Sequence, residues 1–290
     1  MPLRLCPSAN RSTALSCIFI ARERMWIDTH CHLDAGEFAG ENAAIAQGAQ
    51  ERGVSCIVIP AVERANFSTV VELAARHRNC VYALGIHPLY VERSDDSDLA
   101  ALREAVRLAL DDPRFVAVGE IGLDFFVPGL AGGPLREKQE YFYSEQLKIA
   151  RDFDLPVLLH VRRAQDVILK YLRRITVPGG IAHAFNGSFQ QAGHFLDLSF
   201  KLGFGGAMTF TRALQIRRLA TQLPPEAIVL ETDAPDISPS WLHPARNSPE
   251  QLPAIGAALA ELRGMAPQDI ARITTGNARV VLPRLAAAHS

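Results

Sequence analysis

Ile27-Asp28-Thr29-His30-Cys31-His32 places two histidines one residue apart, at the end of a short apolar run that begins at Trp26. Such a run is typical of a β-strand, in which side chains alternate between two faces. His30 and His32 are therefore expected to share a face and to be able to bind one divalent metal ion together. By the same alternation, Cys31 is expected to face away from that metal.

The strand predicted at this position is the first of a series. Apolar runs alternate with amphipathic segments along the chain, and the runs cover residues 26–30, 54–60, 81–86, 116–121, 156–161, 180–184, 200–206 and 228–231. Several runs are apolar throughout, as expected of strands covered on both faces in a parallel sheet. The segments between them space apolar residues three and four apart, as at Leu99, Leu102 and Val106, which indicates amphipathic helices.

Eight strands alternating with eight helices predict a single (β/α)₈ TIM barrel of the α/β class. A doubly wound open sheet is the alternative. Four further candidate ligands each follow their own apolar run: Glu120, His160, His183 and Asp233. The ends of these strands and of the first strand converge only if the sheet closes. Their placement therefore favours the barrel, whose active sites lie at that end.

The predicted metal ligands are six side chains: His30, His32, Glu120, His160, His183 and Asp233. A buried ionised carboxylate is costly unless it is paired or metal-bound, and the two oxygens of Glu120 can bridge two ions. Asp233 is expected to be a ligand and also the group that orients or deprotonates the attacking water, with Glu231 as a supporting carboxylate. Taken singly, His160 and His183 would each more often be structural than a ligand, and a lone pair such as His30 and His32 would be structural about as often as not.

Histidine and carboxylate ligands without cysteine suit Zn²⁺ or Mn²⁺, with Mg²⁺ a further option on the carboxylate side. Two such ions, roughly 3.5–4 Å apart, can activate a bridging water and neutralise charge on a phosphoryl oxygen. The ligand pattern therefore predicts a hydrolase with a divalent metal centre.

Two candidate substrate-binding residues lie near the ends of the third and fifth predicted strands. His87 is expected either to contact a phosphate or to cap the turn that it begins. Arg162 lies two residues after His160 and can bind an anionic oxygen in a fork, or can pair with Glu231 or Asp124.

Two more candidates follow the sixth predicted strand. Asn186 and Ser188 precede a helix, and this segment can present backbone N–H groups to a phosphate. The alternative is that Asn186-Gly187-Ser188 is ordinary helix-entry sequence.

The composition limits the possible functions. A chain of 290 residues that is 48% hydrophobic can bury a large core, and its net charge of −1 gives no electrostatic case for a high-affinity DNA-binding module. The five cysteines are scattered and contain no CxxC pair, which favours reduced thiols. No apolar run approaches the roughly 20 residues of a membrane span. We therefore expect a cytoplasmic protein with no membrane association and no obligate protein partner.

The first 24 residues differ from the rest of the chain. Residues 1–24 hold four arginines and a single acid, and Met25 directly precedes the first predicted strand. We expect 1–24 to be a poorly ordered extension without chemistry and 25–290 to form the barrel domain.

Seven ordered motifs resemble the successive signatures of the TatD-type metal-dependent hydrolases, over residues 26 to about 284. They are Ile-Asp-Thr-His-Cys-His-Leu-Asp, Gly-Ile-His-Pro, Val-Gly-Glu-Ile-Gly-Leu-Asp, Leu-Pro-Val-Leu-Leu-His-Val-Arg, Ala-His-Ala-Phe-Asn-Gly-Ser, Leu-Glu-Thr-Asp-Ala-Pro-Asp and Thr-Thr-Gly-Asn-Ala. The resemblance implies an amidohydrolase-like barrel, two or three divalent cations, and phosphodiesterase or DNase activity, often as a 3′-to-5′ exonuclease. It also places the family's metal ligands on the six residues named above.

Two motifs depart from the commoner family pattern. Asp-Phe-Phe at 124–126 and Ala-Pro-Asp at 234–236 stand where many members carry Asp-Tyr-Tyr and Ser-Pro-Tyr. The chain therefore resembles a less characterised branch most closely, and the tyrosines that could stack on DNA are absent.

Three functions compete at this point. The leading one is metal-dependent hydrolysis of a phosphodiester, in DNA or a smaller nucleotide compound. The second is hydrolysis of an ester or amide, such as deacylation of an aminoacyl-tRNA; many amide-hydrolysing relatives use a modified lysine at a strand end, and no lysine lies at any predicted strand end here. The third is a catalytically silent metalloprotein.

Overall fold

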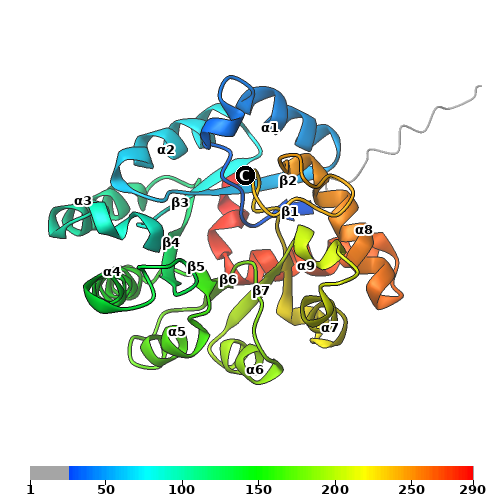
Figure 1. Ribbon diagram of the computed structural model, residues 1–290. Helices are drawn as coiled ribbons and strands as arrows, with labels where there is room; N and C mark the ends of the chain where they lie inside the picture. Colours follow the sequence, from blue (N-terminus) through cyan, green and yellow to red (C-terminus); the bar gives the residue numbers. More distant parts are fainter. Residues whose placement is uncertain (1–25, 290) are drawn as a thin grey trace, which may run out of the picture.

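Parallel strands follow one another around a single sheet in the order of the sequence (Figure 1). The computed structural model describes residues 26–289, and the expected extension over 1–24 lies outside the described residues. Within that range the sheet has eight strands: β1 (Trp26–Asp28), β2 (Val54–Pro60), β3 (Cys80–Leu84), β4 (Phe115–Asp124), β5 (Val157–Arg162), β6 (Gly180–Ala182), β7 (Phe200–Phe204) and β8 (Ile228–Leu230). Each predicted apolar run overlaps one of them.

The helices surround the strands, as Figure 1 shows. Between residues 26 and 289 they are α1 (Asn42–Glu51), α2 (Phe67–Arg76), α3 (Asp96–Ala109), α4 (Gly133–Asp152), α5 (Gln165–Leu172), α6 (Phe189–Asp197), α7 (Leu214–Gln222), α8 (Leu252–Arg263) and α9 (Pro267–Val281). No helix of the described chain combines the length and apolar character needed to cross a lipid bilayer.

The sheet closes through the segments that directly follow β1 and β8. The Thr29 N–H donates to the Leu230 carbonyl oxygen at 3.1 Å, and the Asp233 N–H donates to the His30 carbonyl oxygen at 2.9 Å. The His32 N–H then donates to the Ala234 carbonyl oxygen at 2.8 Å. These bonds join the last strand to the first, so the predicted TIM barrel is confirmed and the open sheet is excluded.

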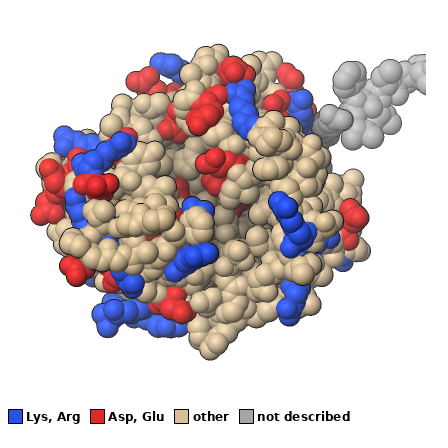
Figure 2. Space-filling model, in the orientation of Figure 1, with Lys and Arg blue, Asp and Glu red and all other residues tan. Residues whose placement is uncertain are grey.

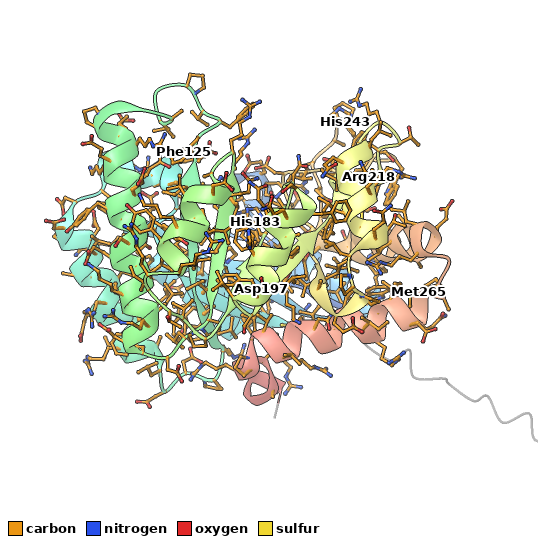
Figure 3. All side chains as sticks on the ribbon, turned by 90° about the horizontal axis from the view of Figure 1, so that it is seen from below. Phe125, His183, Asp197, Arg218, His243 and Met265 are labelled. Carbon is orange, nitrogen blue, oxygen red and sulfur yellow. The ribbon has the colours of Figure 1, made fainter. Side chains whose placement is uncertain are left out.

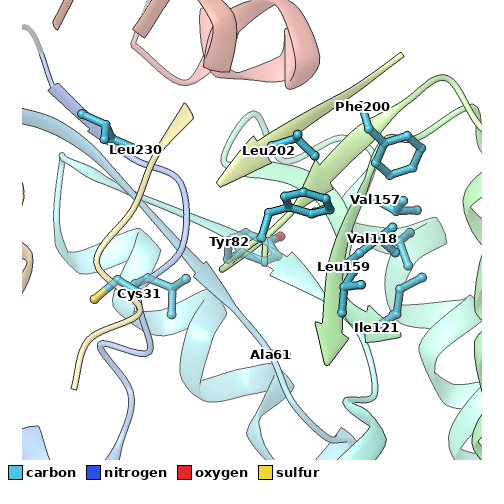
Figure 4. Packing of buried hydrophobic residues seen from close by; sticks show 14 of the residues in the cluster. Cys31, Ala61, Tyr82, Val118, Ile121, Val157, Leu159, Phe200, Leu202 and Leu230 are labelled. Carbon is cyan, nitrogen blue, oxygen red and sulfur yellow. The ribbon is translucent and has the colours of Figure 1, made fainter. Parts of the chain in front are cut away.

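The apolar core forms two layers. One layer lies between the strands and the surrounding helices, and Figure 4 shows part of it, with Tyr82, Val118 and Phe200 among its side chains. The other fills the inside of the barrel, where Val58 and Leu158 are fully buried. Alternating strand residues supply the two layers because successive side chains point to opposite faces.

Helix α9 departs from the simple alternation of strands and helices. It follows α8 without a strand between them, and its Ala278 and Val281 pack with the interior layer of the barrel. Leu282, just after it, joins the same cluster. In Figure 3 this helix lies at the end of the barrel opposite the rim that carries Phe125 and His243. The predicted alternation of eight strands with eight helices is thus confirmed for α1 to α8, and α9 is an additional helix that covers the N-terminal end of the barrel.

Candidate metal centre

The six predicted ligands lie together at the C-terminal ends of the strands. Five of them line one cavity of about 1160 Å³, namely His32, Glu120, His160, His183 and Asp233. His30 is fully buried beneath it. Figure 3 shows His183 below the rim formed by the loops after β4 and β8. The convergence that the sequence predicts is therefore present in the folded chain.

One carboxylate oxygen of Glu120 faces the residues that follow β1. Glu120 Oε2 lies 3.1 Å from His30 Nε2 and 3.4 Å from His32 Nε2. Asp233 Oδ1 lies 3.6 Å from His30 Nε2 and 3.8 Å from His32 Nε2. His30, His32 and Asp233 thus form a group whose ligand atoms are close enough together to hold one metal ion.

The other oxygen of Glu120 faces histidines from three other strands. Glu120 Oε1 lies 3.0 Å from His160 Nδ1 and 3.0 Å from His183 Nε2. His87 Nε2 lies 3.3 Å from the same oxygen. The groups His30–Glu120–His183 and His87–Glu120–His160 could each hold an ion as well. Glu120 therefore stands between potential metal positions, as expected of a bridging carboxylate.

The chain that carries His30 and His32 is extended although β1 ends at Asp28. The Cys31 N–H donates to the Val58 carbonyl oxygen at 3.0 Å, and Cys31 forms a parallel bridge with Ala234. This pairing continues the alternation predicted from the sequence. Cys31 accordingly packs in the apolar layer and belongs to none of the potential metal groups.

A glycine allows the strand of Glu120 to lie against the strand of His160. Gly122 pairs with His160 in the register of β4 and β5. Its φ of 145° lies in a region of backbone conformation that residues other than glycine rarely adopt. A Cβ added at Gly122 would also collide with the backbone carbonyl of His160. The close approach of the two strands thus explains why the second glycine of the Val-Gly-Glu-Ile-Gly-Leu-Asp motif, Gly122, has no side chain.

The buried charges influence one another strongly. Burial opposes ionisation of Glu120, but the imidazoles of His87, His30 and His183 outweigh it and hold the pKa of Glu120 well below its usual range. Burial, assisted by His183, lowers the pKa of His30 to about 3. Burial is also the main cause that lowers the pKa of His87 to about 4. At His32 and His183, by contrast, burial is outweighed by the interaction with Glu120, which raises the pKa to about 9 and to about 10. A histidine must lose its proton to bind a metal ion, so metal binding is expected to release protons from these two side chains.

The donor set fits divalent cations. His30 Nε2 and His32 Nε2 face each other at 3.2 Å, and His160 Nδ1 and His183 Nε2 face each other at 3.4 Å, so ring nitrogens converge in pairs. Each pair also faces an oxygen of the ionised Glu120. Nitrogen and carboxylate donors that converge in this way match the preferences of borderline divalent ions.

Comparison with known proteins agrees with this geometry. The sequence profile of the TatD related DNase family matches residues 27–283. The chain belongs to this TatD family.

Two TatD-family relatives show how far the likeness extends. The chain is 41% identical over 253 residues to "Uncharacterized metal-dependent hydrolase YjjV" of Escherichia coli K12, covering 87% of this chain and 95% of that protein. It is 30% identical to "3'-5' ssDNA/RNA exonuclease TatD" of Klebsiella pneumoniae, covering 88% of this chain and 96% of the relative. The crystal structure of YjjV superposes with a TM-score of 0.84 at 39% identity and covers 90% of this chain and 99% of the other. The protein is thus a metal-dependent hydrolase of the TatD family.

Sequence reasoning overlooked the role of Asp28, a buried carboxylate beneath the TatD-type centre. Asp28 accepts hydrogen bonds from the Thr232 backbone N–H at 2.9 Å and from the Thr232 hydroxyl at 2.6 Å. It also accepts the His30 N–H at 3.3 Å. Asp28 therefore ties the segment of His30 to the segment of Asp233. Its position two residues before His30, inside an apolar run, was the feature of the sequence that could have indicated this role.

Asp124 is the second carboxylate whose role was missed, since the sequence suggested only a pairing with Arg162. Asp124 Oδ2 lies 3.0 Å from His160 Nε2, while His160 Nδ1 faces Glu120. Asp124 Oδ1 accepts the backbone N–H groups of Phe126 at 2.8 Å and Val127 at 3.0 Å. A carboxylate on the far nitrogen of a ligand histidine fixes the orientation of the ring and raises its basicity.

Replacing Asp124 with asparagine is expected to lower metal affinity and kcat/KM by about 10- to 100-fold, the usual cost of losing such a supporting carboxylate. The amide keeps the size of the side chain but removes the charge beside His160. Metal titration and steady-state kinetics measure the two effects. Asp111→Asn, an exposed position after α3, is the matched control. Unchanged metal affinity in the Asp124 variant would contradict the assigned role.

Glu231 is buried beside the centre rather than within it. Its Oε1 accepts the Ala184 N–H at 2.5 Å and lies 3.8 Å from His183 Nδ1. Glu231 and Asp233 both line the cavity. Both residues follow the end of β8 at Leu230, and Asp233 has a φ of 55°, so a turned backbone and not a regular strand carries the Asp233 side chain.

The predicted substrate-binding residues are used in different ways. His87 Nδ1 accepts the Leu89 N–H at 3.1 Å and so caps the turn, while its Nε2 faces Glu120. Arg162 and Asn186 line the cavity. Ser188 does not line it: its hydroxyl accepts the Gln191 N–H at 3.0 Å and caps α6. The Ser188 side chain is therefore a helix N-cap, which is the alternative that the sequence left open.

Proposed function

We propose that the protein is a metal-dependent phosphodiesterase, specifically a deoxyribonuclease with 3′-to-5′ exonuclease-like action. The observation that carries the proposal is the placement of Glu120, whose two oxygens face two different sets of histidines. A carboxylate in this position suits two divalent ions, with Zn²⁺, Mn²⁺ and Mg²⁺ as candidates and His87 as a possible ligand of a third. The name of the Klebsiella relative supports a nucleic acid substrate.

His30, His32 and Asp233 would hold one ion, and His160 and His183 the other, with Glu120 shared between them. When bound, such ions supply Lewis-acid chemistry that polarises a phosphoryl oxygen and lowers the pKa of water. Asp233 orients the attacking water and accepts its proton at a carboxylate oxygen. Asp233 is suited to this role because its side chain lines the cavity and also lies beside His30 and His32.

The remaining residues of the cavity orient the substrate. Arg162 is half exposed at the mouth, where it can neutralise an anionic oxygen of the substrate. His160 is kept in its orientation by Asp124. No lysine lines the described cavity, which disfavours the lysine-bridged centres of amide hydrolases.

The test is a substrate panel with protein stripped of metal and then supplied with Mg²⁺, Mn²⁺ or Zn²⁺. Hydrolysis of bis-p-nitrophenyl phosphate and of single-stranded DNA is expected to return with metal. Hydrolysis of p-nitrophenyl acetate is expected to be lower. Greater metal-dependent turnover of the acetate would instead support the ester or amide hydrolase, such as an aminoacyl-tRNA deacylase.

A further inference from the structure

Three side chains on the rim of the cavity form a cluster beside the metal centre. The Cζ atom of Arg162 lies 3.9 Å from the centre of the Phe126 ring, and that of Arg163 lies 4.6 Å from it. All three residues line the same cavity as Glu120. Phe126 is still 44% exposed, so the two guanidinium groups do not serve merely to bury the ring.

The backbone is turned so that the two arginines meet. Neighbouring residues on a strand point to opposite faces, and Arg162 is the last residue of β5. Arg163 has a φ of 55°, in the left-handed region that residues with a side chain adopt at a cost. This conformation brings the Arg163 guanidinium to the same ring as Arg162. Such local strain is a reason to look for a function at the residue.

The two positive charges have little acidic compensation. Arg162 Nη1 lies 3.8 Å from Asp124 Oδ2, an oxygen that already lies 3.0 Å from His160 Nε2. Within residues 26–289, Arg163 has no carboxylate at ion-pair distance. By contrast, exposed Arg93 lies 2.6 Å from a Glu63 oxygen. The β4–β5 side of the rim therefore offers the Arg163 guanidinium without an ion pair and the Arg162 guanidinium with a single, distant one.

The opposite side of the cavity carries acidic side chains. Asp34, Glu37 and Asp236, from the segments after β1 and β8, line it. Figure 2 looks onto this face and shows acidic and basic side chains around a central hollow. The arginines that line this cavity therefore lie on its β4–β5 side, where they favour an anionic group of the substrate.

The arginine pair is close to the chemistry without being part of it. Only Asp124 and His160 separate Arg162 from Glu120 along a chain of direct contacts. The cavity of about 1160 Å³ exceeds the roughly 300–1,000 Å³ typical of small-molecule sites. There is thus room for a group of the substrate next to the one that is cleaved.

On the basis of the phosphodiesterase function proposed above, we propose that Arg162 and Arg163, held together by Phe126, bind a second phosphate group adjacent to the scissile one. The guanidinium groups donate charge-assisted hydrogen bonds to its oxygens. The substrate class is therefore an oligonucleotide with at least two phosphates. Recognition of this kind does not depend on the base, which agrees with the absence of the stacking tyrosines.

The test compares thymidine dinucleotides that contain one scissile diester. TpT has no other phosphate, pTpT adds one at the 5′ end, and TpTp adds one at the 3′ end. One of the two added phosphates is expected to raise kcat/KM by about 10- to 100-fold, the range that corresponds to charge-assisted hydrogen bonds.

The double variant Arg162→Gln/Arg163→Gln is expected to lose this preference for the second phosphate. Phe126→Leu, which keeps an apolar side chain but removes the ring, is expected to lose part of it. Arg173→Gln/Arg174→Gln removes the same charge from exposed positions at the other end of α5 and is the matched control. An equal loss in the control, or a wild-type protein indifferent to both added phosphates, would overturn the proposal.

Equilibrium binding separates this proposal from the function on which it depends. The affinity of metal-free protein for fluorescently labelled TpT, pTpT and TpTp is measured without hydrolysis. If no phosphodiester is cleaved, the proposed function fails, yet tighter binding of a two-phosphate ligand that is lost in the double arginine variant still supports the phosphate site. Equal affinity for all three ligands contradicts it.

Discussion

Replacing Glu120 with glutamine is expected to abolish metal binding and to lower kcat/KM by at least about 10³-fold. Loss of Lewis-acid stabilisation costs several kcal/mol of transition-state energy, and about 1.4 kcal/mol corresponds to a factor of ten. The amide has nearly the same shape as the carboxylate, but it has no charge and only one acceptor oxygen. It therefore cannot serve the histidine groups on both of its sides, at 3.0–3.4 Å.

Metal content by mass spectrometry and turnover of bis-p-nitrophenyl phosphate measure the two losses in parallel. Circular dichroism checks that the barrel still folds, as expected for a change that keeps the side-chain volume. Glu137→Gln, on the exposed face of α4, is the matched control and should retain both properties. A Glu120 variant that keeps its activity after losing its metal would refute the metal-dependent mechanism.

Replacing Asp233 with asparagine is expected to lower kcat by about 10²- to 10⁴-fold, the usual contribution of a general base. The asparagine oxygen can still be a ligand beside His30 and His32, so metal should remain bound at saturating concentration. The lost function is acceptance of the proton from water. Because this loss affects the chemical step, KM should change much less than kcat.

Steady-state kinetics at saturating Mn²⁺, with metal content measured on the same samples, separate these effects. The control is Asp197→Asn on the exposed face of α6. If the Asp233 variant lost its metal completely, Asp233 would be assigned as a ligand whose removal disassembles the centre. If its kcat were unchanged, another group would have to be the base.

The barrel and the convergence of the six candidate ligands could be predicted from the sequence for a common reason. Each ligand directly follows an apolar run, and parallel strands that close into a barrel bring such positions to one end. His30, His183 and Asp233 thus needed only a periodic pattern and a closed sheet to be placed together. Strand alternation also placed Cys31 on the opposite side correctly.

What could not be predicted depends on contacts across strands. Asp124 supports His160 because β4 and β5 are paired in one register, and register is not readable from either strand alone. His87 faces Glu120 as well as capping its turn, a dual use that spacing does not reveal. Helix α9 was missed as a separate element because its role is to cover one end of the barrel, which depends on the completed fold.

The join between the first and last strands has a consequence for synthesis of the protein. Asp28 and Thr232, which are 204 positions apart, fasten the two ends of the ring, and His30 and Asp233 belong to the same metal group only across this join. A nascent chain that has not yet delivered β8 to β1 has an incomplete metal group. We therefore expect hydrolytic activity to appear only after the ribosome has released enough chain for β8 to pair with β1.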